Sequence, residues 1–205
     1  MDFRFLDATN LFPIPLYRFR IDDPALDKAL LGEIAVRRKS EGGQQNVNRL
    51  GWQSASDLFD RTEEGHRSLN RRIIQILREV VRSEDPSVDF ERLRLHLNGW
   101  VNVNPPGGFN SPHQHSEAHW SGVYYVDVPQ SPSGNGGSIE FLSPHPVRLT
   151  GGLIKAPSAR DRVRIAPEAG DMLIFPGSLP HWVLPNDSKK ARTTIAFNAV
   201  LAAKR

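Results

Sequence analysis

The feature of this sequence that most constrains its fold is a change of hydrophobic period near residue 89. In residues 92–104, leucines at alternate positions are interleaved with Arg92, Arg94 and His96. An alternation of this kind is typical of a β-strand with one buried face and one exposed face. Further β-like runs, separated by clusters of glycine and proline, cover residues 120–126, 138–142, 162–165, 171–175, 181–184 and 193–201. Many short strands with turn signals between them predict an antiparallel sandwich or barrel.

Two helices are predicted ahead of this β region. Asp23 followed by Pro24 is typical of a helix start, and apolar residues at helical spacing continue to about Lys39. A second helix is predicted over residues 64–82, with arginines and His66 on its solvated face. The prolines within residues 11–20 favour an extended edge segment before the first helix.

These patterns predict one domain that is mainly β with flanking helices. A chain of 205 residues is long enough to bury a core of its own, and no linker interrupts it. We therefore predict a single domain over residues 1–205, with an N-terminal helical flank over residues 1–88 and a β core over residues 89–205. Residues 143–160 are predicted to form a loop that could act as a lid.

The composition excludes several classes of function. The chain has no cysteine, so any metal would need histidine, carboxylate or water ligands. The net charge is only +3 and the arginines are spread widely, which does not favour nucleic-acid binding. There is no run of about 18 apolar residues and no signal-like start, so we expect a cytoplasmic protein without a membrane partner.

Three histidines are the candidate metal ligands. His113 and His115 are two positions apart, so on a strand they would point to the same face, and Glu117 would continue that face. His181 lies far along the chain. Imidazole and carboxylate ligands that leave coordination positions open suit iron(II) oxygenase chemistry. Two ligand sets remain open, one with all three histidines and one in which Glu117 completes a triad with His115 and His181. His119 is interpreted as a pocket residue.

A candidate anion site follows the third histidine. Arg192 and Thr194 would share one strand face, and a guanidinium beside a hydroxyl is suited to bind a carboxylate. Asn102, near the end of the first alternating strand, could contact a cosubstrate or a substrate. Tyr125 is a further candidate for the lining of the same cavity.

Four short motifs resemble the 2-oxoglutarate/Fe(II)-dependent oxygenases, most of all a bacterial and phage branch related to prolyl hydroxylases. They are His-Gln-His-Ser at 113–116, Ser-Gly-Val-Tyr-Tyr at 121–125, Phe-Pro-Gly-Ser-Leu-Pro-His at 175–181 and Arg-Thr-Thr-Ile-Ala-Phe-Asn at 192–198. Ser116 departs from this branch, which usually has proline at that position. The resemblance implies a double-stranded β-helix, the cupin-like jelly roll.

The resemblance also implies the chemistry. His113, His115 and His181 would hold Fe(II), and the cosubstrate 2-oxoglutarate would bind Arg192 with help from Thr194. The expected function is a dioxygenase that hydroxylates an unidentified amino acid, peptide or small metabolite. Two alternatives remain, namely a cupin-like non-haem metalloenzyme that does not use 2-oxoglutarate and a catalytically inactive jelly-roll binding module. Edge strands would also allow a homodimer.

Overall fold

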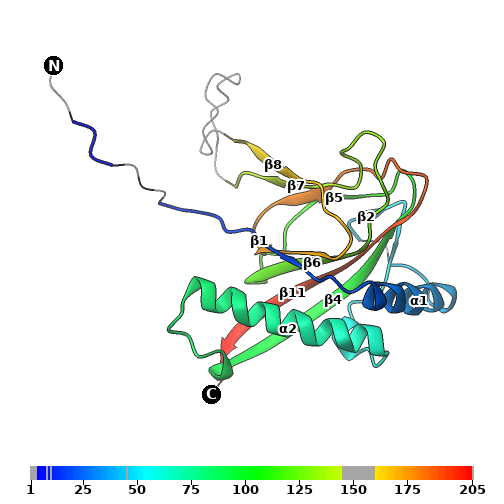
Figure 1. The fold of residues 1–205 in the computed structure, drawn as a ribbon, viewed down its shortest axis with the longest axis horizontal. Helices are drawn as coiled ribbons and strands as arrows, with labels where there is room; N and C mark the ends of the chain where they lie inside the picture. Colours follow the sequence, from blue (N-terminus) through cyan, green and yellow to red (C-terminus); the bar gives the residue numbers. More distant parts are fainter. Residues whose placement is uncertain (1–3, 8, 10, 45, 145–159, 205) are drawn as a thin grey trace.

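The computed structural model describes residues 4–7, 9, 11–44, 46–144 and 160–204. Within them, two antiparallel sheets face each other, and the two α-helices lie against one sheet (Figure 1). The helices are α1 (Pro24–Ser40) and α2 (Glu64–Glu84), and two short 3-10 helices are η1 (Leu58–Asp60) and η2 (Phe90–Arg92). The strands are β1 (Tyr17–Arg20), β2 (Asn48–Arg49), β3 (Trp52–Gln53), β4 (Leu93–Asn104), β5 (Phe109–His113), β6 (Trp120–Asp127), β7 (Ile139–Leu142), β8 (Arg162–Ile165), β9 (Asp171–Pro176), β10 (His181–Val183) and β11 (Arg192–Ala203).

The order of the strands is that of a jelly roll. In the described residues, the six-stranded sheet has the order β1-β9-β6-β11-β4-β3 and the five-stranded sheet the order β2-β5-β10-β7-β8. From β4 to β11, the chain crosses from one sheet to the other at every step except the β7–β8 hairpin. The predicted fold, mainly β with flanking helices, is therefore confirmed.

Both predicted helices form where the sequence places them. Asp23 caps α1, its carboxylate accepting a hydrogen bond from the backbone N–H of Leu26 at 3.0 Å. Along α2, Leu69, Ile73 and Leu77 form an apolar stripe that packs on the six-stranded sheet. Neither described helix is both long enough and apolar enough to span a bilayer.

The central strands of the six-stranded sheet supply one face to this helix-covered core and the other to a cavity between the sheets. On β11, Ile195 and Ala199 belong to the helix-side core, whereas Arg192, Thr194 and Ala196 line the cavity. The alternation of side chains along a strand produces this division, because neighbouring residues face opposite sides. A single run of residues thus stabilises the fold and builds the site.

The N-terminal part of the chain contributes strands as well as helices. β1 pairs with β9, β2 with β5 and β3 with β4. β2 and β3 have two residues each, too few to show a period in the sequence. β5 was not predicted either. The lid predicted over residues 143–160 falls mostly on residues 145–159, which lie outside the described residues.

His66 is not on the solvated face of α2, contrary to the prediction from the sequence. It is 1% exposed, and its Nδ1 lies 2.6 Å from an Oε atom of Glu33 on α1. The same carboxylate accepts hydrogen bonds from the backbone N–H groups of Gly65 and His66. The N-cap residue of α2 is Glu63, and its side chain makes no capping hydrogen bond. Glu33, on the neighbouring helix α1, therefore accepts the hydrogen bonds of these backbone donors.

Replacing Glu33 with alanine is expected to lower the free energy of unfolding by about 2–3 kcal/mol, because two backbone donors and a buried imidazole lose their acceptor. Urea unfolding followed by circular dichroism measures this loss. Glu64→Ala is the matched control, since Glu64 is 77% exposed and its ion pair with Arg71 lies in water. We expect less than about 0.5 kcal/mol for that variant. Equal losses in the two variants would contradict a capping role for Glu33.

Candidate active site

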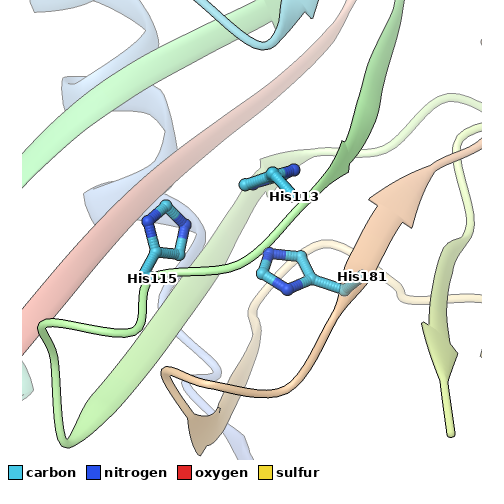
Figure 2. A group of neighbouring side chains, drawn as sticks. All are labelled: His113, His115 and His181. Carbon is cyan, nitrogen blue, oxygen red and sulfur yellow. The ribbon is translucent and has the colours of Figure 1, made fainter. Parts of the chain in front are cut away.

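The three histidines predicted as metal ligands lie together between the two sheets (Figure 2). His113 is the last residue of β5 and His181 the first of β10, and the two are direct neighbours across this strand pair. His115 comes two residues later, on the loop that follows β5, and its ring turns back toward the other two. One nitrogen from each ring lies within 4.8 Å of the others. Three converging imidazoles can bind one metal ion.

Backbone carbonyl groups fix the orientation of two of these rings. Nδ1 of His113 lies 2.7 Å from the carbonyl oxygen of Ser111, and Nδ1 of His181 lies 2.8 Å from that of Leu179. A carbonyl oxygen only accepts, so each Nδ1 carries the hydrogen and each Nε2 keeps a free lone pair. This is the arrangement by which proteins usually orient histidine ligands.

The three imidazoles are neutral at physiological pH. Burial is the main cause that lowers the pKa of each ring, and the pKa falls to about 4 for His115 and to about 3 for His181. The neighbouring His113 lowers both of these values further. Metal binding requires the neutral ring, so no proton has to be displaced at pH 7.

Glu117 does not join this cluster. The chain leaves the strand after His113 and turns at residues 116–117, so the expected sharing of one face does not extend to Glu117, which is exposed. His119 is exposed too, and its Nδ1 accepts a hydrogen bond from the backbone N–H of Leu201. The interpretation of His119 as a pocket residue was therefore wrong. Of the two ligand sets, the geometry favours the three histidines.

The predicted anion-binding residues line the same cavity. Thr194 on β11 lies between Asn102 on β4 and Tyr125 on β6 in the register of the sheet. Arg192 is 2% exposed, and its guanidinium carbon lies 5.1 Å from the centre of the Tyr125 ring. All four side chains share the cavity with the three histidines. Trp100 and Asn110 also line it and were not predicted, since neither belongs to a recognisable motif.

Arg192 is a buried cation without a carboxylate partner among the described residues. Among the described residues two arginines are almost fully buried, and the other, Arg37, forms ion pairs with Glu41 at 2.6 Å and Asp57 at 2.7 Å. Arg192 has no such pair in this part of the chain, its Nε atom has no hydrogen-bond partner, and burial lowers its pKa. An uncompensated buried charge is costly, so this end of the cavity is suited to an anionic ligand.

The residues present fit both a metal ion and a dicarboxylate. The described lining of the cavity combines three imidazoles with Arg192 and contains no acidic side chain. A ligand with two carboxylates could therefore meet the metal with one end and Arg192 with the other. Three protein ligands would leave further coordination positions open.

Comparisons with known proteins agree with this arrangement. A family model described as "Putative 2OG-Fe(II) oxygenase" matches residues 98–198, which contain the three histidines and Arg192. No curated protein matches the sequence.

Solved structures share the fold at low sequence identity. A prolyl-4-hydroxylase from Pseudomonas putida is 19% identical with a TM-score of 0.64, and the match covers 93% of this chain and 92% of that chain. A prolyl hydroxylase from Trichoplax adhaerens, in complex with a peptide fragment of the hypoxia inducible factor oxygen degradation domain, is 14% identical with a TM-score of 0.63 and coverages of 90% and 82%. HygX from Streptomyces hygroscopicus, with nickel and 2-oxoglutarate bound, is 12% identical with a TM-score of 0.60 and the same coverages. The jelly-roll fold is thus confirmed.

Proposed function

Because residues 98–198 belong to the 2OG-Fe(II) oxygenase family, we propose that His113, His115 and His181 bind iron(II) and that Arg192 binds the distal carboxylate of 2-oxoglutarate. The protein is an Fe(II)- and 2-oxoglutarate-dependent dioxygenase. In the proposed reaction, one atom of dioxygen enters succinate and the other enters the hydroxylated product, while carbon dioxide leaves. Bound iron(II) supplies the chemistry that activates dioxygen.

The observation that carries this assignment is that Arg192 is buried and has no acidic partner in the part of the chain that the structure describes. A cupin-like metalloenzyme that does not use 2-oxoglutarate could employ the three histidines, but it would leave Arg192 buried without a counterion among the residues described. A dicarboxylate cosubstrate supplies that counterion. An inactive binding module would have no need for three converging, neutral imidazoles.

The chain's own residues would bind and orient the cosubstrate. The Arg192 guanidinium donates charge-assisted hydrogen bonds to the carboxylate, and the Thr194 hydroxyl beside it adds a donor. Phe175 packs edge-on against His181, with 4.8 Å between ring centres, and helps to exclude water from the metal ligands. Asn102 and Tyr125 complete the polar wall along the cosubstrate.

The reaction that we propose is hydroxylation of a C–H bond in an amino acid, a peptide or a small metabolite. The presence of prolyl hydroxylases among the structural neighbours, one of them with a bound peptide, supports this range. We treat residues 1–205 as one functional domain. The homodimer and the cytoplasmic location stay predictions.

An anaerobic titration of the purified protein with iron(II) and 2-oxoglutarate tests the proposed function. We expect a weak visible charge-transfer band that appears only when both are present, and succinate formation once oxygen is admitted. Iron binding without this band would favour the cupin-like alternative. A protein that binds no iron would instead be a ligand-binding module.

A further inference from the structure

Four buried asparagines connect the two sheets beside the cosubstrate pocket. Asn102 and Asn104 lie on β4 of the six-stranded sheet, whereas Asn48 on β2 and Asn110 on β5 belong to the five-stranded sheet. Each is at most 5% exposed. Asn48 donates to Asn102 at 3.1 Å, and Asn104 donates to Asn48 at 3.3 Å and to Asn110 at 3.2 Å. Each of these bonds crosses from one sheet to the other.

One backbone carbonyl fixes the orientation of all four amides. The Nδ2 group of Asn48 also lies 3.4 Å from the carbonyl oxygen of Trp52, which can only accept. This contact turns the nitrogen of Asn48 toward the Oδ1 of Asn102 and its own Oδ1 toward Asn104. Asn104 must then present its nitrogen to both Asn48 and Asn110. A reversal of any one amide would place two donors or two acceptors against each other.

The consequence for the pocket is a pair of oriented donors. Asn102 and Asn110 both line the cavity that holds the three histidines and Arg192. Their Oδ1 atoms are occupied by the network, and their Nδ2 groups donate to no group in the part of the chain that the structure describes. The amide nitrogens are therefore the atoms that remain for a ligand, and an amide N–H₂ group pairs with acceptors such as carboxylate oxygens.

We propose that Asn48 is a positioning residue that holds Asn102 directly, and Asn110 through Asn104, with their N–H₂ groups toward 2-oxoglutarate. This inference rests on the proposed function, because it takes the ligand of the pocket to be that cosubstrate. Asn48 itself does not line the cavity. It acts by preventing the amides from turning their oxygens toward the carboxylate. Gly51 leaves room for the side chain of Asn48, since a Cβ at position 51 would lie 2.1 Å from Oδ1 of Asn48.

The experiment uses Asn48→Ala in the full chain with zinc(II) in place of iron(II), which permits binding measurements without turnover. We expect the affinity for 2-oxoglutarate to fall about tenfold, because two hydrogen bonds to a charged group lose their fixed donors. Asn70→Ala is the matched control: Asn70 is a buried asparagine on α2 that donates to the carbonyl oxygen of Leu58, on the helix side of the sheet. This variant should lose stability and keep its affinity.

A second readout does not depend on the folding of any variant. In the wild-type protein, the side-chain N–H₂ signals of Asn102 and Asn110 should shift in nitrogen-15 spectra as 2-oxoglutarate is added, and the signal of Asn70 should not. Unchanged affinity in Asn48→Ala, or unmoved Asn102 and Asn110 signals in wild-type protein that binds 2-oxoglutarate, would overturn the positioning role alone. Failure of the wild-type protein to bind 2-oxoglutarate would overturn the proposed function as well.

Discussion

Replacing Arg192 with methionine is expected to weaken 2-oxoglutarate binding at least about 100-fold while leaving the ligand-free protein as stable as before or more stable. Removing either partner of a buried ion pair costs about 3–5 kcal/mol of interaction free energy, because the remaining charge stays buried without compensation. In the ligand-free protein the balance is different, because Arg192 is already buried without an acid partner among the described residues. An apolar side chain of similar length removes the desolvation cost of the charge.

Thermal unfolding with and without 2-oxoglutarate measures both parts of this prediction in one series. The wild-type protein should be stabilised by the cosubstrate, and Arg192→Met should lose this stabilisation. Arg37→Met is the matched control, since Arg37 is equally buried but paired with Glu41 and Asp57. We expect it to lose about 2 kcal/mol of stability, because the two remaining carboxylates are partly hydrated, and to keep its cosubstrate affinity. If Arg192→Met still bound 2-oxoglutarate normally, the carboxylate would have to bind elsewhere.

The fold was largely predictable because hydrophobic period is a local signal. β4 alternates over six positions before both its faces become buried, and α2 carries a clear apolar stripe, so both elements could be placed from the sequence. Elements that depend on a distant partner were missed. β2 and β3 consist of two residues each and exist only because β5 and β4 pair with them.

The site was predictable where a motif fixes the residues and not where packing does. His113 and His115 were expected to share a strand face, but the strand ends at His113 and the loop turns His115 back to the cluster. The face-sharing argument therefore identified this pair but failed for Glu117. Asn48 gave no signal at all, since its role depends on the carbonyl of Trp52 and on two residues more than 50 positions away.

His181→Ala is expected to reduce iron(II) affinity more than about 100-fold, because the change removes a proposed metal ligand. Even the loss of a group that only hydrogen-bonds to a metal ligand costs about 10–100-fold. The His181 side chain is buried, and the carbonyl of Leu179 aims its Nε2 at the other two rings. Iron content after anaerobic loading and desalting measures the effect. His119→Ala is the control of the same residue type: His119 is exposed, outside the cluster, and its loss should leave the iron content unchanged.

The same measurement distinguishes the two ligand sets that the sequence left open. Glu117→Gln should retain iron, since Glu117 is exposed and outside the cluster, whereas His113→Ala should lose it. The opposite pattern would mean that the loop after β5 rearranges on metal binding to replace His113 with a carboxylate. The geometry opposes such a rearrangement, because both the ring and the backbone of His113 are fixed. Its Nδ1 donates to the carbonyl oxygen of Ser111, and its backbone lies opposite that of His181 in the strand pair.

The charge of the cavity also favours the three-histidine set. Three neutral imidazoles add no negative charge to the described lining, so Arg192 and the bound metal would be the only fixed charges there, both positive, and would face the two carboxylates of 2-oxoglutarate.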